Sequence, residues 1–508
     1  MITKVKSVGL MGMTAYTVEV EADISRGIPR FDIVGLPDTA VKESKDRVSS
    51  AMKNCGYEFP VGKITINLAP ADVKKSGSIY DLSILMAMIQ TTGQLDADID
   101  NSAFIGELSL SGELRPVNGV LPMVLYAQEE GYENIFIPVE NAGEASVVEG
   151  INVYAIEHVK ELVNFLVGAI ELSTIKPFEN STHNEQFSPD FSEVKGQFGA
   201  RRALEIAAAG GHNAILIGSP GSGKSMLAKR LPSILPDMTF EESIETTKIH
   251  SISGLLSKSQ PLVMTRPFRA PHHTVSPAGL SGGGSIPKPG EISLAHNGVL
   301  FLDELPEFSR PAMEILRQPI EDGKVTISRV NGTLTYPCSV MLIAAMNPCP
   351  CGYFGHPTRP CTCSSGKVAH YLSKVSGPLL DRLDLHIDAM PVEFDHISSK
   401  TPSESSAEIK LRVDKARKIQ NERYKGTGIT CNARLTPARL QKDCPVSESG
   451  LQLLRNAFEK LGLSARAYDR ILKVSRTIAD LDESDTLESR HIAEAIQYRS
   501  LDRKYWQA

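Results

Sequence analysis

The strongest chemical signal in the chain is a glycine-rich loop that ends in a lysine and a serine. The short apolar run Ala214–Ile217 precedes the loop and a helical stretch follows it. The loop follows the pattern GxxxxGKS, in which backbone N–H groups and a helix N-terminus surround phosphates. Its residues are Gly218, Ser219, Pro220, Gly221, Ser222, Gly223, Lys224 and Ser225. We expect Lys224 to contact the β- and γ-phosphates of ATP and Ser225 to coordinate Mg²⁺.

Two further apolar runs end in polar residues that suit triphosphate hydrolysis. The run Val299–Leu302 ends in Asp303 and Glu304, about 80 residues after the phosphate loop. Asp303 is expected to hold the Mg²⁺ shell and Glu304 to polarise the attacking water. The run Val340–Ala345 leads to Asn347, which either orients that water or only caps the turn that follows. These motifs predict an ATPase that uses ATP and Mg²⁺.

Four cysteines lie close together in the pattern C-x-C-x₉-C-x-C. They are Cys349, Cys351, Cys361 and Cys363. Four thiolates in one loop suit tetrahedral Zn²⁺, although two intervening residues are commoner than one within each pair. Free thiols and a redox disulfide remain as alternatives, and His356 or His370 could replace one ligand. We predict a zinc loop inserted at 347–365.

Taken together, these motifs resemble those of AAA+ ATPases. The segment Ser376–His386 resembles the arginine-finger segment of magnesium chelatases and MCM-type helicases, and Ser464–Arg470 resembles their sensor 2. The resemblance implies that Arg382 acts on ATP bound by a neighbouring subunit and that Arg466 contacts the γ-phosphate. A surface salt bridge for Arg382 and a helix-face charge for Arg466 are the structural alternatives. The resemblance also places Gly196 and Gln197 beside the adenine.

The whole chain resembles the magnesium-chelatase-like AAA+ ATPases of the competence-associated ComM/YifB group. This implies a homo-oligomeric ring, expected to be a hexamer, that hydrolyses ATP and acts on single-stranded or branched DNA. The implied activity is that of a helicase or branch-migration translocase in recombination and natural transformation, with recombination proteins as candidate partners. A remodeller of proteins or complexes, as in magnesium chelatase, is the alternative, and an ATP-dependent Lon-like protease is less favoured.

The N-terminal region resembles the proteolytic domain of Lon, which has a ribosomal S5-type fold. The resemblance rests on Gly106–Gly119 and covers about residues 60–165. The position of the serine nucleophile corresponds to Ile79 and that of the catalytic lysine to Leu121, and neither side chain can do this chemistry. We therefore predict a domain without proteolytic activity that serves assembly. A shifted dyad is the alternative, built from Ser78 or Ser83 with Lys74 or Lys75.

Two segments beside the predicted motor residues are candidates for DNA contact. Residues 324–336 alternate around an Asn-Gly pair, which indicates a β-hairpin and resembles the pre-sensor hairpin of helicase-like AAA+ proteins. Residues 250–290 resemble the helix-2 insert of magnesium chelatases. Within it, the side chains that could contact phosphates are Arg269, His272, His273 and Lys288. An ordinary surface hairpin and structural histidines are the alternatives.

These residues need a scaffold, and the pattern of the chain predicts an α/β fold in three parts. We expect a Lon-like domain at 1–170, a linker at 171–192, a P-loop AAA+ core at 193–395 and a helical C-terminal lid at 396–508. Strands are expected at Tyr16–Val20, Lys63–Asn67 and Asn134–Pro138, and helices at Tyr80–Gln90 and Leu121–Glu130. Amphipathic helices should follow at 416–424, 448–463, 465–481 and 489–501.

The net charge of −6 argues against a strongly basic DNA-binding protein, but the charge is uneven. Residues 1–170 hold 13 basic and 23 acidic side chains, whereas residues 401–508 hold 20 basic and 15 acidic ones. A polyanion would therefore favour the second part of the chain. No apolar run approaches the roughly 18 residues of a membrane span. The first residues hold no long apolar stretch, so we expect a cytoplasmic protein without a signal peptide or membrane partner.

Overall fold

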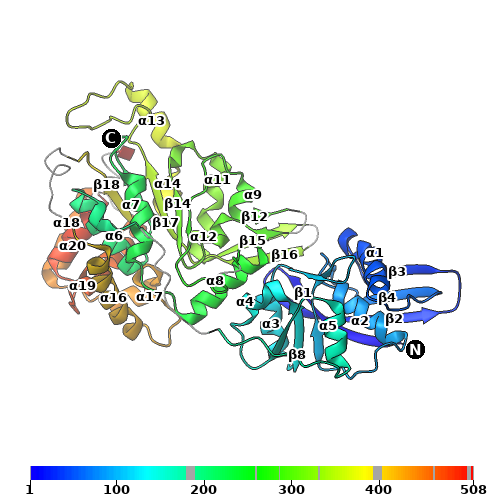
Figure 1. The fold of residues 1–508 in the computed structure, drawn as a ribbon. Helices are drawn as coiled ribbons and strands as arrows, with labels where there is room; N and C mark the ends of the chain where they lie inside the picture. The colour runs from blue at the N-terminus through cyan, green and yellow to red at the C-terminus, as the bar shows by residue number, and fades with distance from the viewer. Residues whose placement is uncertain are drawn as a thin grey trace. The chain divides into compact units, whose positions relative to one another are not determined.

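A computed structural model describes residues 2–178, 189–257, 260–284, 287–329, 332–392, 403–461, 464–499 and 505–506. The chain forms two units of mixed α/β structure, each with its own core (Figure 1). The N-terminal unit contains residues 1–182 and also 243–263, and the C-terminal unit contains 183–242 and 264–508. No pattern in the sequence indicated that residues 243–263 would fold with the N-terminal unit.

A mixed seven-stranded sheet organises the N-terminal unit, in the order β3-β4-β2-β1-β5-β8-β9. The strands are β1 (Thr3–Met11), β2 (Thr14–Ser25), β3 (Arg30–Val34), β4 (Lys63–Ala69), β5 (Ser102–Phe104), β8 (Asn134–Pro138) and β9 (Asn152–Ile156). β2 pairs antiparallel with β1 and β4, whereas β5, β8 and β9 are parallel. The three predicted strands are confirmed within β2, β4 and β8. The alternating run that forms β1 was not predicted.

Helices cover this sheet, and two of them match predicted ones to within one residue. They are α1 (Thr39–Asn54), α2 (Asp81–Thr91), α3 (Val120–Glu129), α4 (Ala142–Ala145) and α5 (Val159–Leu166). A small hairpin, β6 (Glu107–Leu108) and β7 (Leu114–Arg115), lies beside α2. α2 is buried along nearly its whole length against β1 and β2, as its continuous apolar sequence requires. Most of α8 (Phe240–Ile252) also belongs to this unit.

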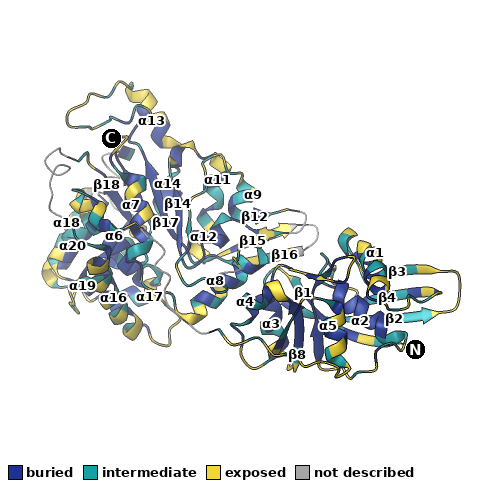
Figure 2. Cartoon of the chain, viewed as in Figure 1, coloured by how far each residue is buried: buried dark blue, intermediate teal, exposed yellow. Residues whose placement is uncertain are grey.

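A parallel five-stranded sheet lies at the centre of the C-terminal unit, in the order β11-β14-β17-β10-β18. The strands are β10 (Ala214–Ile217), β11 (Phe268–Arg269), β14 (Val299–Leu302), β17 (Met341–Met346) and β18 (Leu385–Asp388). Every residue of β10, β14 and β17 is buried, as short apolar runs in parallel sheets require (Figure 2). Ile217 pairs with Met346 and Leu302 with Ala344, so these strands end at one edge of the sheet.

Further helices of the C-terminal unit precede the last helical part of the chain in sequence. They are α6 (Phe198–Gly210), α7 (Lys224–Arg230), α9 (Pro277–Ser281), α10 (Glu291–Leu294), α11 (Arg310–Ile315), α12 (Arg317–Asp322), α13 (Ser365–Ser373) and α14 (Gly377–Leu380). The predicted hairpin is confirmed as β15 (Lys324–Arg329) and β16 (Gly332–Pro337). Its turn residues 330–331, including Asn331, lie outside the described residues. The insert before β14 adds a small ribbon, β12 (Gly282–Gly283) and β13 (Lys288–Pro289).

The last part of the chain is helical and shares one hydrophobic core with the parallel sheet. Its helices are α16 (Ser406–Arg423), α17 (Pro437–Asp443), α18 (Glu448–Leu461), α19 (Ala465–Leu481) and α20 (Ser489–Gln497). The four predicted amphipathic helices are confirmed within α16, α18, α19 and α20. α19 packs against α6, α16 and α20. Among the described residues, no helix is long and apolar enough to cross a membrane.

Candidate functional site

The phosphate loop and the end of β17 meet through one lysine. The Nζ of Lys224, the first residue of α7, donates to the carbonyls of Gly218 at 2.8 Å and Ser219 at 3.0 Å. It also donates to Oδ1 of Asn347 at 3.1 Å. Burial lowers the pKa of Lys224, while the charge of Asp303 opposes this shift. The structure thus brings together two predicted residues that are more than 120 positions apart in sequence.

A hydroxyl and a carboxylate suited to Mg²⁺ lie beside this lysine. The Oγ of Ser225 donates to Oδ2 of Asp303 at 2.5 Å. The other carboxylate oxygen of Asp303 accepts a hydrogen bond from the backbone N–H of Glu304 at 2.9 Å. Hard oxygen ligands of this kind are those that Mg²⁺ prefers. Both residues predicted for the metal are therefore in contact, one from α7 and one from the end of β14.

The predicted catalytic glutamate has a partner that the sequence did not reveal. Glu304 adopts a left-handed backbone conformation with φ of 52°, and 58% of its side chain is exposed. Its Oε2 lies 3.3 Å from Nδ1 of His273, which belongs to the insert before β14. Non-glycine residues in this conformation concentrate at functional sites. His273 was predicted only as a candidate for phosphate contact, and no local pattern links it to Glu304.

A cavity of about 870 Å³ opens beside Glu304 and Asn347. Helix α13 contributes Lys367, His370 and Tyr371 to its lining, and Lys374, just after α13, also lines it and pairs with Glu307 at 3.6 Å. Lys367 offers an anionic group a positive charge here. The cavity therefore adjoins the place where the γ-phosphate and attacking water are expected.

The segment predicted to lie beside the adenine also reaches the phosphate loop. Gly196 and Gln197 both have positive φ, and Gln197 begins α6. The Nε2 of Gln197 donates to the carbonyl of Ser222 at 2.8 Å and to that of Met390, just after β18, at 2.6 Å. Gln197 therefore holds the phosphate loop against two other segments of the same unit.

The two arginines predicted to act on ATP lie near one another at the base of α14 and α19. Arg382 donates to the carbonyls of Arg317 at 3.1 Å and Pro378 at 2.7 Å and forms an ion pair with Glu321. In the single chain, Arg382 thus forms a salt bridge, which was the alternative to its predicted role as an arginine finger. The side chain of Arg466 is 68% exposed, and its Nη1 lies 3.9 Å from the carboxylate of Asp381.

A buried polar network joins the start of β18 to α19 and was not predicted. The Nδ1 of His212 lies 3.0 Å from Asp384, and its Nε2 lies 2.7 Å from Oγ1 of Thr477. Arg470, within the sensor 2 motif, pairs with the same Asp384. Burial opposes ionisation of Asp384, but Arg470 and His212 outweigh it and hold the pKa of that carboxyl well below its usual range.

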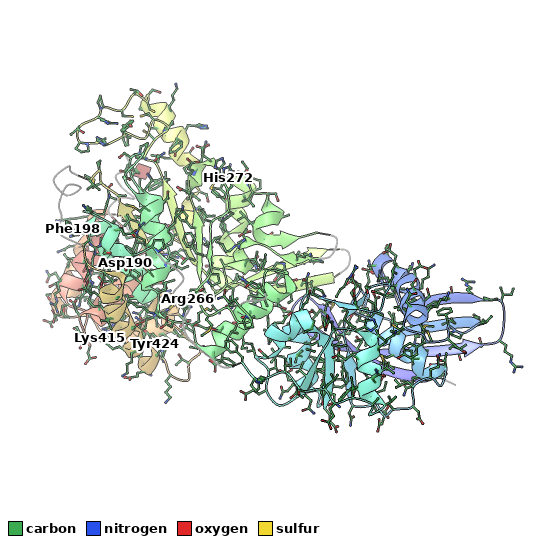
Figure 3. All side chains as sticks on the ribbon, viewed as in Figure 1. Asp190, Phe198, Arg266, His272, Lys415 and Tyr424 are labelled. Atoms are coloured by element: carbon green, nitrogen blue, oxygen red, sulfur yellow. The ribbon has the colours of Figure 1, made fainter. Side chains whose placement is uncertain are left out.

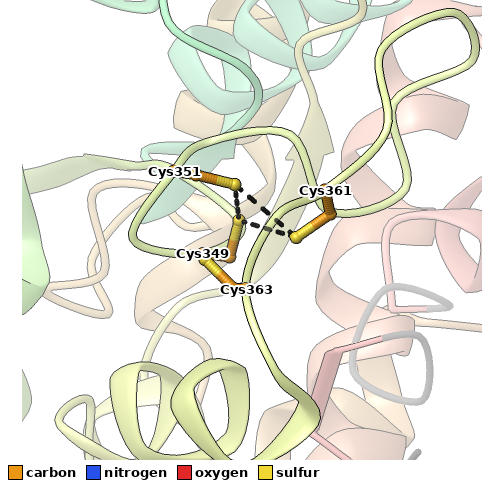
Figure 4. A group of neighbouring side chains, drawn as sticks. All are labelled: Cys349, Cys351, Cys361 and Cys363. Atoms are coloured by element: carbon orange, nitrogen blue, oxygen red, sulfur yellow. Dashed lines mark hydrogen bonds between the residues drawn. The ribbon is translucent and has the colours of Figure 1, made fainter.

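The four clustered cysteines point toward one another from the two ends of one loop (Figure 4). Their sulfur atoms all lie within 4.8 Å of each other. The sulfur of Cys349 is 3.4 Å from that of Cys351 and 3.7 Å from that of Cys361, so neither pair is a disulfide, whose S–S bond is about 2.0 Å long. Burial raises the pKa of Cys349 to about 12, whereas the backbone N–H of Tyr353 lowers that of Cys351 to about 5.

One of the two histidines weighed as a zinc ligand faces its own loop, and the other lines the cavity. The Nδ1 of His356 accepts hydrogen bonds from the backbone N–H groups of Thr358 at 3.2 Å and Arg359 at 3.0 Å. His370 is exposed on α13, where it lines the cavity beside Glu304. Among the described residues, the four cysteines are the only group of three or more His, Cys, Asp or Glu side chains close enough to share a metal ion.

The insert before β14 presents less free charge than its sequence suggests. Arg266 and His272 of this insert are labelled in Figure 3. Arg269 forms a bidentate ion pair with Glu291, at 2.7 and 2.8 Å, so its charge is already compensated. His272 contacts Oγ1 of Thr274 at 2.9 Å, and Lys288 is exposed on β13. Arg269 is therefore a poorer candidate for phosphate contact than Lys288.

The Lon-like positions in the N-terminal unit contain no catalytic pair. Leu121 is fully buried, and its backbone N–H donates to Glu144 at 3.1 Å. Ser251 of α8 donates to the same carboxylate. Three residues of the shifted dyad have partners outside it: the hydroxyl of Ser78 donates to Glu107, that of Ser83 to the carbonyl of Tyr80 at 2.8 Å, and the buried amine of Lys75 to the carbonyl of Pro70.

Comparisons with known proteins place this site in a family. Family models match at residues 20–141 (subunit ChlI of Mg-chelatase), 190–397 (magnesium chelatase, subunit ChlI) and 403–499 (magnesium chelatase, subunit ChlI C-terminal). The chain is 44% identical to the uncharacterized protein YifB of Escherichia coli over 497 residues, covering 97% of this chain and 96% of YifB. It is 44% identical to the competence protein ComM of Haemophilus influenzae over 501 residues, with the same coverage.

A more distant similarity connects part of the chain to a protease. It is 24% identical over 168 residues to the Lon protease of Mycolicibacterium smegmatis, covering 30% of this chain and 21% of that protein. This similarity is limited in extent, whereas those to YifB and ComM run nearly from end to end. The chain therefore belongs to the ComM/YifB family of magnesium-chelatase-like AAA+ proteins.

Proposed function

We propose that this protein is an ATP-hydrolysing ring motor that acts on DNA as a helicase or branch-migration translocase. The observation that carries the proposal is the meeting of three strand ends at one edge of the parallel sheet. There Lys224 contacts Asn347 at 3.1 Å, and Ser225 contacts Asp303 at 2.5 Å. This is the arrangement that positions a triphosphate, its metal ion and a water for hydrolysis.

Each residue of the site has a distinct task in the proposed reaction. The N–H groups of residues 218–223 and the amine of Lys224 bind the phosphates. Ser225 and Asp303 would hold Mg²⁺, which neutralises negative charge on the phosphates when bound. Glu304 accepts a proton from the attacking water, and Asn347 orients that water. Gln197 holds the phosphate loop in place beside the nucleoside.

Completion of the site by a second subunit is part of the proposal. Arg382 pairs with Glu321 of α12 and Arg466 lies near Asp381, just after α14, so neither has its ionic partner in the phosphate loop of its own chain. We assign Arg382 to the ATP bound by a neighbouring subunit, which requires a closed ring, expected to be a hexamer, and we assign Arg466 to the γ-phosphate from the helical lid. Arg382 would exchange its contact with Glu321 for the phosphate.

DNA is the proposed substrate because of the charge distribution, the hairpin and the similarity to ComM. The family includes a protein named for competence, and residues 401–508 carry an excess of basic side chains. The hairpin β15–β16 and the exposed Lys288 are the proposed contacts in the pore. The N-terminal unit would have the Lon-type fold without its proteolytic dyad and would serve the assembly.

ATP turnover with and without single-stranded or branched DNA tests the proposal. We expect DNA to stimulate turnover and the Glu304→Gln variant, with ATP, to be retained on forked DNA. Binding should weaken steeply with salt, because phosphate contacts release counterions. If DNA does not change the rate of ATP turnover and the protein does not bind forked DNA, a remodeller like magnesium chelatase would be favoured instead. Degradation of casein would favour a protease.

A further inference from the structure

We propose that Cys349, Cys351, Cys361 and Cys363 bind one zinc ion and that this ion holds a wall of the nucleotide site against the phosphate loop. Binding of zinc by the four cysteines does not depend on the proposed function. The effect of the ion on the nucleotide site rests on the proposed ATPase function. The contact of Gly352 with Pro220 connects the cysteine loop to the phosphate loop.

The sulfur geometry fits a tetrahedral zinc ion. Sulfurs placed about 2.3 Å from a tetrahedral centre are separated by about 3.8 Å. The pairs among Cys349, Cys351 and Cys361 are separated by 3.4, 3.7 and 3.5 Å, and Cys363 lies within 4.8 Å of all three. These distances are too long for disulfides and suited to four thiolates that share one cation.

Backbone groups of the loop already support the sulfurs. The N–H of Phe354 donates to the sulfur of Cys349 at 3.3 Å, and the backbone at Tyr353 and Thr362 donates to that of Cys351. Such donors stabilise thiolates and orient metal ligands. Residues 347–364 form no helix or strand, so a metal ion would supply much of the free energy that orders this segment.

The loop touches the phosphate loop at a position where only glycine fits. Gly352 has φ of 83°, and its N–H donates to the carbonyl of Cys349 at 2.9 Å. A Cβ at this position would lie 2.3 Å from Cδ and 2.6 Å from Cγ of Pro220. Gly352 therefore rests directly on the ring of Pro220, only one residue away from the ligand Cys351.

A small cavity lies beside the phosphate loop. Its lining includes Gly218 and Ser219 of the phosphate loop and Pro348, Gly352 and Phe354 of the cysteine loop. The cysteine loop therefore forms a wall of a cavity that it shares with the phosphate loop. Loss of the metal should release this wall and loosen the phosphate loop.

Metal content tests whether the four cysteines bind zinc. By elemental mass spectrometry, the purified wild-type protein should contain about one zinc ion per chain, and Cys363→Ser should contain almost none. Cys55→Ser, which alters a buried cysteine of the N-terminal unit, is the matched control and should keep its zinc. Wild-type protein without stoichiometric zinc, or with iron in its place, would overturn the proposal, as would full zinc in Cys363→Ser.

Binding of a fluorescent ATP analogue tests whether the cysteine loop supports the phosphate loop. Gly352→Ala leaves every cysteine in place, so we expect it to keep its zinc but to bind the analogue about tenfold more weakly. Gly428→Ala is the matched control, because Gly428 has φ of 74° but open space where a Cβ would be. The control should bind like the wild type. Wild-type affinity in Gly352→Ala would refute the coupling between the cysteine loop and nucleotide binding, but it would not contradict zinc binding by the cysteines.

Removal and return of the metal supplies a test that needs no variant. A zinc-selective chelator should weaken binding of the analogue to wild-type protein, and added Zn²⁺ should restore it. Unchanged affinity after verified removal of zinc would contradict the coupling. Wild-type protein that binds zinc but no ATP analogue would instead refute the proposed ATPase function, so the two failures are distinguishable.

Discussion

At the scale of single residues, the site depends on side chains that contact each other across large sequence separations. Glu304 illustrates this, because its carboxylate lies 3.3 Å from His273 while its backbone adopts a left-handed conformation. The chemistry assigned to Glu304 requires its carboxylate to face a water beside the γ-phosphate. The contact with His273 competes with that orientation.

Replacement of Glu304 by glutamine should separate binding from hydrolysis. The amide cannot accept the proton of water, so we expect the turnover number to fall at least about 100-fold while ATP affinity is retained. Steady-state turnover and equilibrium binding of a fluorescent ATP analogue measure the two effects. Glu422→Gln, on the exposed face of α16, is the control and should resemble wild type. Turnover retained by Glu304→Gln would show that another group activates the water.

Removal of the imidazole at 273 should raise basal turnover. His273→Ala frees the carboxylate of Glu304 from a contact at the protein surface, and contacts of this kind are weak, so we expect about a two- to fivefold increase in kcat without DNA. The KM for ATP should stay unchanged, because His273 contacts the glutamate and not the phosphate loop. A fall in kcat would mean that His273 positions Glu304 for catalysis.

At the scale of elements, the helical C-terminal part is joined to the sheet through buried polar contacts. The network of His212, Asp384, Arg470 and Thr477 connects the first residues of β18 to α19. Arg382 lies two residues before Asp384, so the network also anchors the segment that carries the proposed finger. Rotation of α19 would therefore move the finger.

Loss of the charge at Asp384 should destabilise the C-terminal unit. Asp384→Asn removes the charge of a buried carboxylate that pairs with the half-buried Arg470 and with His212, and breaking a buried pair costs about 3–5 kcal/mol of unfolding free energy. Urea unfolding followed by circular dichroism measures the loss. Lys415→Ala removes an exposed pair with Glu483 at 3.9 Å and serves as the control, with little expected change. Equal midpoints for both variants would contradict the role assigned to the network.

Element boundaries were predictable where the local pattern was strong. β8, β10 and β14 have the predicted bounds, and α19 does as well, because apolar periodicity and turn residues mark their ends. β1 was missed because the polar residues Lys4, Lys6 and Ser7 interrupt its apolar residues and resemble an exposed segment. The place of residues 243–263 in the N-terminal unit depends on Ser251 and Glu144, which no local signal connects.

At the scale of the whole molecule, the proposed action of Arg382 on the ATP of a neighbouring subunit can be tested only in the assembled protein. Arg382→Ala should lower turnover by a factor of about 10³ or more, because a finger in trans contributes that much. Lys224→Ala should also be inactive, since it cannot bind the phosphates. If Arg382 acts across an interface, mixing the two variants should restore part of the turnover.

The mixing experiment has a clear negative outcome. Mixed rings contain sites in which an intact phosphate loop faces an intact Arg382, so partial activity is expected only for action in trans. Turnover that stays at the level of the separate variants, in rings shown to have exchanged subunits, would place Arg382 on the ATP of its own chain. Light scattering and analytical ultracentrifugation report the subunit number of the rings.

The sequence by itself determined the chemistry of the site, because the phosphate loop is a local strand–loop–helix feature and four cysteines within fifteen residues must lie close together. The tertiary structure decided which distant segments meet. The order of the parallel strands places Asp303 beside Ser225 and Asn347 beside Lys224. The contacts of His273 with Glu304 and of Gly352 with Pro220 depend on packing between loops, which no periodicity encodes.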